Sequence, residues 1–388
     1  MKIALFTDTY FPQINGIVTS IAALARGLTE RGHQVTLIVP KTRKSISPPH
    51  SNVEMKRIRG VPALFYKGFK FTLPVHPGLF RFIRKNKFDV LHFHTPITIG
   101  LQAVLMGRVL KIPVIGTFHT FFADSQYLKH AHLDYGLVEK AGWYYSNMFY
   151  NYCDLVTCHA QSTRQELIEN GCRAPIEIIS NGIDVRRIDN SRAEEFRSQY
   201  APDGPLLLFV GRIAHEKNLP MLLNAFADIV AQIPTCRMLL VGEGPQMRDT
   251  EKTIATLGLQ HNARLLGPIK HDELLRSGIF GASDLFVTAS TTENQPMTIL
   301  ESLASGLPCV GPNARGIPDL VQNGINGAIF EPDNKDAMVN AVLGLLLDPP
   351  KLQKMRLGAL ESAQQHSFET VLERWETCYN EIVSQKKK

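Results

Sequence analysis

Residues 283–310 read SDLFVTASTTENQPMTILESLASGLPCV, and this pattern predicts a strand, a loop, a helix and a second strand. The apolar run at 283–290 is typical of a buried strand. Residues 304–310 end the helix and begin the next strand. Strands that alternate with helices in this way form a parallel sheet, which binds ligands at the carboxyl ends of its strands. The stretch therefore predicts an α/β fold with a ligand site near the loop at 291–296.

The same alternation of apolar runs and amphipathic stretches extends over the whole chain in two cycles. Strands are expected in the first cycle at 3–7, 35–39, 90–93, 114–117, 155–157 and 176–179, with helices at 17–31, 77–85, 98–110, 133–151 and 161–170. Strands are expected in the second cycle at 206–210, 237–241, 264–266, 285–288, 309–310 and 328–330, with helices at 219–231 and 335–347. A polar stretch at 184–204 is typical of a linker. A chain of 388 residues predicts two domains, here two Rossmann-like domains at 1–190 and 204–367.

Two glutamates, Glu293 and Glu301, flank the turn from loop to helix. The backbone N–H groups at a helix start bind anions, and carboxylates on either side can accept hydrogen bonds from hydroxyls. A phosphate with hydroxyls at both ends describes a nucleotide-sugar. The alternative is that Glu293 ends a loop and Glu301 is a solvated helix residue.

Two cations follow the strand at 206–210, namely Arg212 and, five residues later, Lys217. Departure of a diphosphate from a nucleotide-sugar develops negative charge, which fixed cations and backbone donors stabilise. Backbone N–H groups around Met297 and Thr298 would complete such a cradle. The alternative is a surface salt-bridge pair.

A block of positive charge lies at 55–88, which holds nine Lys or Arg residues, no Asp or Glu, and seven aromatic residues. Cations among aromatic rings suit an anionic membrane surface. Nucleic acid could use the same composition, but no nucleic-acid-binding motif accompanies it. The remaining alternative is a solvated loop followed by an amphipathic helix whose phenylalanines face the core.

Other features limit the class of protein. No stretch approaches the roughly 20 apolar residues of a membrane span, and the first residues enter a strand, so no signal peptide is expected. The six cysteines have no metal-binding spacing and are expected to be reduced in the cytoplasm. The first strand is followed by Pro-Gln-Ile-Asn-Gly, which lacks the G-x-G-x-x-G fingerprint of NAD-binding proteins. Gly16 either closes on a phosphate or sugar or only starts a helix.

The Glu-x7-Glu spacing in this strand–loop–helix setting resembles the signature of retaining glycosyltransferases of family 4. The resemblance covers nearly the whole chain, and the other segments that carry it are Ile14-Asn15-Gly16, Gly116-Thr117-Phe118-His119-Thr120, Asn181-Gly182-Ile183-Asp184, Val210-Gly211-Arg212 with Lys217, and Val241-Gly242-Glu243-Gly244-Pro245. It implies the GT-B fold, in which two Rossmann-like domains face each other across a cleft. It also implies that the last helix, at 368–388, packs back on the first domain.

The resemblance further implies the residues of the site. Arg212 and Lys217 would clamp the diphosphate, Glu301 would accept from the ribose, and Glu293 from the donor hexose. His119, at the end of the strand at 114–117, would lie near the transferring sugar, and a structural histidine is the alternative. The implied catalytic residues are His119, Arg212, Lys217 and Glu293. The implied donor-binding residues are Gly16, Arg212, Lys217, Gly244, Ile269, Lys270, Glu293, Met297, Thr298 and Glu301.

The acceptor is suggested by His94-Thr95-Pro96 and the aromatic segment at 118–124, which look most like bacterial glucosyltransferases that act on diacylglycerol. The implied reaction moves a hexose, with glucose favoured, from a UDP-sugar rather than a GDP-sugar to a membrane lipid. The protein would then be cytoplasmic and peripheral on the inner face of the cell membrane. No cofactor or bound metal is expected, and stimulation by Mg²⁺ is left open. A soluble acceptor and a sugar-nucleotide epimerase are the alternatives.

Overall fold

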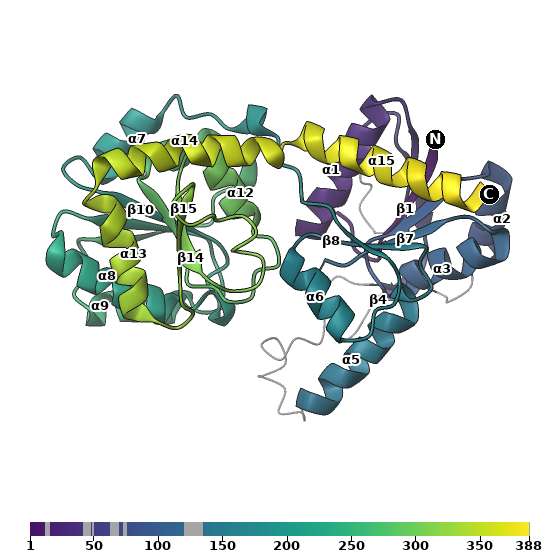
Figure 1. Cartoon of the computed structure of the whole chain (residues 1–388), viewed down its shortest axis with the longest axis horizontal. Coiled ribbons are helices and arrows are strands. Elements are labelled where there is room, and N and C mark those ends of the chain that lie inside the picture. Colours follow the sequence, from purple (N-terminus) through teal and green to yellow (C-terminus); the bar gives the residue numbers. More distant parts are fainter. Residues whose placement is uncertain are drawn as a thin grey trace. The chain divides into compact units, whose positions relative to one another are not determined.

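The chain consists of two compact units in a computed structural model (Figure 1). The structure describes all residues except 12–15, 42–47, 49, 63–69, 73–75, 120–134 and 388. Unit 1 comprises Met1–Ser180 and Val371–Lys388, and unit 2 comprises Asn181–Thr370. Each unit contains a parallel sheet flanked by helices. The predicted α/β class with two Rossmann-like domains is confirmed.

Unit 1 is built on a seven-stranded parallel sheet. Its strands, in spatial order, are β3 (Glu54–Ile58), β2 (Gln34–Pro40), β1 (Lys2–Phe6), β6 (Val90–Phe93), β7 (Val114–Thr117), β8 (Leu155–Cys158) and β9 (Ile176–Ile178). Its helices are α1 (Gly16–Glu30), α2 (Pro77–Asn86), α3 (Thr98–Leu110), α5 (Tyr135–Tyr150) and α6 (Gln161–Glu169). The basic block also contains β3 and a short antiparallel pair, β4 (Gly60–Pro62) with β5 (Lys70–Thr72), which the sequence pattern did not predict. The alternation is weak there because β3 is an edge strand with one fully buried side chain, Ile58.

Unit 2 contains a six-stranded parallel sheet. Its strands, in spatial order, are β12 (Ala263–Gly267), β11 (Arg237–Val241), β10 (Leu206–Val210), β13 (Leu285–Val287), β14 (Cys309–Pro312) and β15 (Gly327–Phe330). Its helices are α7 (Ala193–Tyr200), α8 (Leu219–Gln232), α9 (Met247–Thr256), α10 (His271–Arg276), α11 (Ile279–Ala282), α12 (Met297–Ala304), α13 (Lys335–Leu346) and α14 (Pro349–Gln365). The two short 3-10 turns are Val185–Arg187 and His215–Lys217.

The prediction of a linker at 184–204 is wrong, because much of this stretch folds as α7 within unit 2. Arg197 of α7 donates to Asp284 at 2.7 Å and to the carbonyl of Ala282 at 2.8 Å. Asp284 in turn accepts from Arg356 at 3.2 Å. The polar composition of this stretch was the basis for predicting a linker. The polar side chains instead join α7 to the start of β13 and to α14.

Both faces of the unit 2 sheet are covered, so its strands are continuous apolar runs rather than alternating ones. Leu207 and Phe209 of β10 are buried in one cluster with Phe226 of α8. Leu208 lies in the opposite cluster with Leu303 of α12. Burial on both faces thus holds α8 and α12 on opposite sides of the sheet.

The last helix, α15 (Phe368–Lys387), belongs to unit 1 from Val371 onward. Tyr379 is fully buried, and its hydroxyl lies 2.8 Å from Nδ1 of His92 on β6. Glu376 accepts hydrogen bonds from Arg31 at 2.7 Å and from His33 at 2.8 Å. Polar and aromatic contacts from a distant part of the chain therefore stabilise the first sheet.

We expect the substitution Tyr379→Phe to lower the free energy of unfolding by about 1–3 kcal/mol, because it leaves Nδ1 of buried His92 without its partner. Denaturant titration measures this loss. Tyr144→Phe is the control, since Tyr144 is 77% exposed and should change stability little. Equal effects of the two substitutions would contradict the assignment.

Candidate functional site

The loops that follow β10 and β13 meet through an ion pair between Lys217 and Glu293. Each of these two side chains is only 19% exposed. Ser290 Oγ donates to the carbonyl of Glu216 at 3.0 Å, and the Gly316 N–H donates to the carbonyl of Glu293 at 2.9 Å. The structure therefore brings together one predicted cation and one predicted carboxylate, and it fixes the backbone beside both.

Arg212 lies in the same loop as Lys217 but is 63% exposed. Its nearest carboxylate oxygen, on Glu216, is 3.9 Å away, so the pair is weak. An ammonium has three N–H donors, and Glu293 Oε1 occupies one of those of Lys217. Both cations therefore have donors left for an anion.

The helix that follows the loop of Glu293, α12, starts without a side-chain cap. The N–H groups of Ile299 and Leu300 bond to the carbonyl of Pro296 at 3.1 and 3.4 Å. The N–H groups of Met297 and Thr298 have no hydrogen-bond partner in the described part of the chain. The N-cap residue, Pro296, has no N–H and no side-chain acceptor, so it cannot cap these groups with its side chain. Two donors at the positive end of a helix thus remain available to an anion.

Glu301 lies inside α12 and is only 2% exposed. Its Oε1 is 2.6 Å from Nε2 of His271, the first residue of α10. This hydrogen bond raises the pKa of His271 above the usual 6.5, while partial burial opposes the rise. Ile269 packs against the core and Lys270 is the N-cap residue of α10. Sequence reasoning missed His271, although it directly follows the predicted Ile269 and Lys270.

The glycines after β11 permit a close approach of two backbones. Gly242 has a φ of +141°, and a Cβ there would lie 1.8 Å from the carbonyl oxygen of Gly211. A Cβ on Gly244 would lie 2.3 Å from the carbonyl oxygen of Ile213. The Ile213 N–H also donates to the carbonyl of Glu243 at 3.0 Å. Packing of the β11 loop against the loop of Arg212 therefore already requires glycine, before any ligand is considered.

In unit 1, several polar residues stand where the strands end. Asp8 follows β1 and accepts from the N–H of Ile99 at 2.8 Å and from the hydroxyl of Thr98 at 3.0 Å, so it caps α3. Its burial raises the pKa of this carboxyl to about 6. Gly16 is the first residue of α1 and is exposed, and residues 12–15 before it lie outside the described residues. Sequence reasoning missed Asp8, although its place directly after a strand is a usable signal.

Three histidines form a hydrogen-bonded row beside the ends of β6, β7 and β8. His94 Nδ1 is 3.0 Å from His119 Nε2, and His119 Nδ1 is 3.1 Å from His159 Nε2. His159 Nδ1 is 2.8 Å from the carbonyl oxygen of Ile179. Burial lowers the pKa of all three imidazoles, which favours their neutral forms.

The carbonyl at one end determines where every proton in this row lies. A carbonyl only accepts, so Nδ1 of His159 carries its proton and Nε2 is an acceptor. Nδ1 of His119 must then be the donor to His159, and Nδ1 of His94 the donor to His119. His94 Nε2 is left as a buried lone pair with no partner in the described part of the chain. Both ring nitrogens of predicted His119 are thus engaged by protein, and its ring can bond a sugar only by exchanging one of these partners.

Among the described residues, no group of three or more His, Cys, Asp or Glu side chains is placed to hold a metal ion. His92, whose ring centre lies 4.1 Å from that of His94, bonds to Thr117 at 2.6 Å and to Tyr379. The candidate site of unit 2 therefore consists of cations, carboxylates and backbone donors, whereas that of unit 1 consists of neutral histidines.

We expect Glu301→Gln to lower the pKa of His271, because the hydrogen bond to this carboxylate is the main cause of its rise. An NMR titration of the His271 imidazole measures the shift. Glu273→Gln, on the same helix as His271, serves as control. A folded pKa above the unfolded one stabilises the native state fully below about pH 6.5 and loses this effect as pH rises through the folded value. The stability difference between wild type and Glu301→Gln should therefore shrink as pH rises above neutrality. An unchanged pKa for His271 would contradict the pairing.

The order of protons in the histidine row can be observed directly. Long-range ¹H–¹⁵N correlation spectra at pH 7 should show His94, His119 and His159 as neutral Nδ1–H tautomers. His159→Gln should preserve the tautomer of His119, because the Gln Oε1 can accept at the position of Nε2. In His159→Ala, His119 should no longer be restricted to the Nδ1–H tautomer, since the acceptor for its Nδ1–H group is lost. A protonated His119, or its Nε2–H tautomer in wild type, would disprove the order.

The comparisons with known proteins agree with this architecture. Residues 14–187 match the family model for glycosyltransferase family 4, and residues 190–361 match that for glycosyl transferases group 1. The chain is 30% identical to the α-monoglucosyldiacylglycerol synthase of Streptococcus pneumoniae, over 92% of this chain and 81% of that protein. It is 26% identical to the synthase of the same name from Acholeplasma laidlawii, over 100% and 99%. A GDP-mannose-dependent α-mannosyltransferase of Corynebacterium glutamicum is 24% identical, over 99% and 90%.

Solved structures show the same fold at lower identity. A protein from Anabaena, crystallised with UDP, superposes with a TM-score of 0.79 at 18% identity, over 98% of this chain and 100% of the other. Sucrose-phosphate synthase from Thermosynechococcus elongatus superposes with a TM-score of 0.77 at 18% identity, over 99% of each chain. The two-unit architecture and both family matches lead to one assignment: the chain belongs to glycosyltransferase family 4 and is a nucleotide-sugar-dependent hexosyltransferase of GT-B fold.

Proposed function

We propose that the protein transfers glucose, with retention of configuration, from UDP-glucose to the hydroxyl of 1,2-diacylglycerol. The observation that carries the donor half of this proposal is the Lys217–Glu293 ion pair next to a helix start with two unpartnered N–H groups. The two α-monoglucosyldiacylglycerol synthases support glucose and a lipid acceptor. The relatives that use GDP-mannose make it the second candidate donor.

The donor would bind to unit 2 through its diphosphate. Arg212, Lys217 and the N–H groups of Met297 and Thr298 would stabilise the charge that develops as UDP departs. Lys217 and the two N–H groups are already held in place, so they need little reorganisation when the bond breaks. Fixed cations can do here what a divalent metal does elsewhere, and Mg²⁺ would at most stimulate the rate.

Hydroxyls of the donor would bind on either side of the diphosphate. Glu301 has one oxygen on His271 and the other for the ribose, while Ile269, Lys270 and Gly244 would contact the nucleotide through their backbone. Glu293 would accept from the hexose through the oxygen that Lys217 does not engage. A carboxylate held in an ion pair is a weaker nucleophile, which favours attack by the acceptor on the face that UDP leaves over a covalent intermediate on Glu293.

The acceptor would bind to unit 1, near the histidine row that includes His119. An inner-face membrane location follows from a lipid acceptor together with the exposed cations of α2, Arg81, Arg84 and Lys85. No helix among the described residues is long and apolar enough to cross a bilayer.

The aromatic side chains of the basic block contribute less to membrane contact than the sequence pattern predicts. Phe88 is buried, and Phe80 and Phe82 pack against the core of unit 1. Phe65, Tyr66 and Phe69 lie outside the described residues. The alternative reading, an amphipathic helix whose phenylalanines face the core, therefore holds for α2.

We expect Lys217→Met to lower kcat/KM for UDP-glucose by about 10²- to 10³-fold, because it removes one fixed charge from the leaving diphosphate. UDP release with diacylglycerol in detergent micelles measures the rate. Lys252→Met is the matched control, since Lys252 is a 78% exposed lysine on α9. A kcat/KM for Lys217→Met equal to that of Lys252→Met would contradict the donor-site assignment.

Donor and acceptor identity require a separate measurement. Mass spectrometry of products formed from UDP-glucose or GDP-mannose, with diacylglycerol or soluble sugars as acceptors, distinguishes the candidates. The proposal expects a monoglucosyl lipid from UDP-glucose. Conversion of UDP-glucose to another UDP-sugar without acceptor would instead indicate an epimerase.

A further inference from the structure

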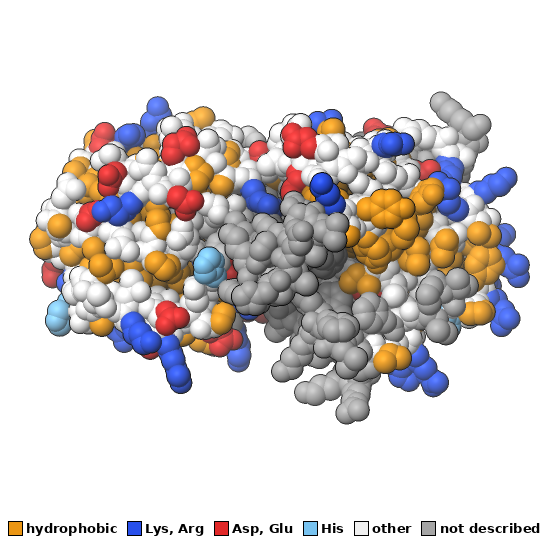
Figure 2. All heavy atoms as spheres, turned by 90° about the horizontal axis from the view of Figure 1, so that it is seen from below, with side chains coloured by type: hydrophobic (Ala, Val, Ile, Leu, Met, Phe, Trp, Pro, Cys, Tyr) orange, Lys and Arg blue, Asp and Glu red, His pale blue; other side chains and the backbone are white. Residues whose placement is uncertain are grey.

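Six apolar or aromatic side chains of unit 1 are exposed on two neighbouring helices. Four belong to α5 and the turn after it, and two belong to α3. We call this set the α3–α5 face, and its members are Leu105, Val109, Tyr144, Tyr145, Met148 and Tyr152. Tyr144 is 77% and Val109 is 68% exposed. Figure 2 shows hydrophobic side chains gathered in one area of this unit.

The spacing of these residues makes the face continuous. Tyr144, Met148 and Tyr152 follow one another at intervals of four, as residues on one side of a helix do. The guanidinium of Arg108 on α3 lies 4.0 Å from the centre of the Tyr152 ring and so links the two helices. Leu105 and Val109 lie on either side of Arg108 in the α3 sequence, also four apart.

The other side of α5 is apolar too. Trp143, Phe149 and Tyr150 are buried in the core of unit 1. A surface helix is normally apolar on one side only, and a helix that is apolar on both sides is normally covered on both. Single exposed apolar residues are common, but a contiguous group of six on two packed helices marks an interaction surface.

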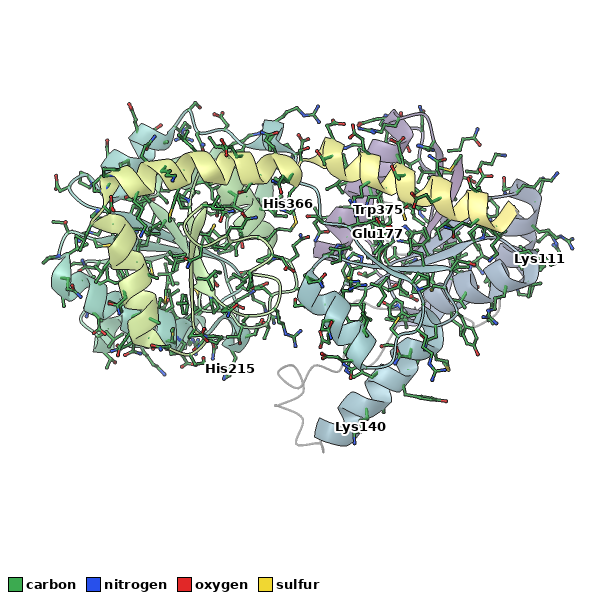
Figure 3. All side chains as sticks on the ribbon, viewed as in Figure 1. Lys111, Lys140, Glu177, His215, His366 and Trp375 are labelled. Carbon is green, nitrogen blue, oxygen red and sulfur yellow. The ribbon has the colours of Figure 1, made fainter. Side chains whose placement is uncertain are left out.

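The charged residues around the face are mainly cations. Lys140 is four residues before Tyr144, and Lys111 follows α3 (Figure 3). A surface pocket of about 390 Å³ beside Tyr152 is lined by Arg108, Lys111, Asp154 and Lys386, among others. Lys386 pairs with Asp154 at 2.8 Å, whereas no described carboxylate pairs with Arg108 or Lys111. The margin of the face can therefore bind anionic groups.

We propose that the α3–α5 face rests on the surface of an anionic bilayer. Tyrosines suit this position because the ring enters the interface while the hydroxyl stays among headgroups. Met148, Leu105 and Val109 would enter the acyl boundary, and Arg108 and Lys111 would contact lipid phosphates. The choice of a bilayer as the partner depends on the proposed lipid acceptor, whereas the exposure of the face does not.

A second copy of the chain fits the face less well. A symmetric dimer places the same patch of both subunits in contact. The cations around one face would then meet the same cations of the other, and Asp154, the described carboxylate in the pocket lining, is already paired with Lys386. A bilayer rich in anionic lipid offers both the apolar depth and the negative charge.

Vesicle binding tests the proposal on the full chain. Wild type should sediment with vesicles of phosphatidylcholine and phosphatidylglycerol and much less with phosphatidylcholine alone. The double variant Tyr144→Ser/Met148→Ser should bind the anionic vesicles at least about tenfold more weakly, and Lys111→Ser/Lys140→Ser should weaken binding by a similar factor. The matched control is Leu347→Ser/Leu357→Ser, two exposed leucines of unit 2, which should bind like wild type.

A local probe separates docking from loss of folding. In Tyr144→Trp, the tryptophan emission should shift to the blue when anionic vesicles are added, whereas in Leu347→Trp it should not. No shift in Tyr144→Trp, together with loss of binding in Arg81→Ser/Arg84→Ser, would overturn the proposal in favour of α2. A wild-type dimer that Tyr144→Ser/Met148→Ser dissociates would overturn it in favour of a second copy.

Activity distinguishes this proposal from the proposed function. The docking variants should keep wild-type rates on diacylglycerol in detergent micelles and lose rate only on vesicles. Vesicle binding through this face without any glucosyl transfer would leave docking intact and disprove the function. Equal transfer by wild type and variants on anionic vesicles would leave the function intact and disprove docking.

Discussion

The ion pair between Lys217 and Glu293 is the contact on which the proposed donor site depends. Its partners come from loops after β10 and β13, neighbouring strands of one parallel sheet. Two mostly buried charges are stable only when paired, so each keeps the other in place before any ligand arrives. Hydrogen bonds from Ser290 and Gly316 fix the backbone of the same loops. These contacts hold the Lys217 cation rigidly at the proposed position of the diphosphate.

The two units differ in the polar groups that lie near their strand ends. Unit 2 places charges at its strand ends and pairs them, as in Glu301 with His271. Unit 1 places three neutral imidazoles there, ordered by the backbone carbonyl of Ile179, and one carboxyl, Asp8, that caps α3. Negative charge develops on a departing diphosphate, and a lipid hydroxyl is neutral. The charged groups of unit 2 and the neutral histidine row of unit 1 are therefore consistent with the proposed donor in unit 2 and the proposed acceptor in unit 1.

The α3–α5 face adds a reason for the composition of unit 1. The core of unit 1 buries only one side of α5, yet both sides of this helix are apolar. The basic block at 55–88, which sequence reasoning favoured for membrane contact, contains the described rings of Phe80, Phe82 and Phe88 mainly as core. The proposed lipid contact therefore rests on the exposed tyrosines of α5 rather than on the rings of the basic block.

Local patterns were sufficient for the α/β class, because buried parallel strands are continuous apolar runs and their helices are amphipathic. They also led to the prediction that Arg212, Lys217, Glu293 and Glu301 are site residues, since each lies close to a strand end or helix start. Only the tertiary structure decided which of these meet: Lys217 pairs with Glu293, whereas Arg212 stays exposed. The histidine row and His271 likewise depend on strand order, which brings together residues tens of positions apart. Exposure of the α3–α5 face could not be predicted either, because the sequence of a helix does not say which apolar side the rest of the protein covers.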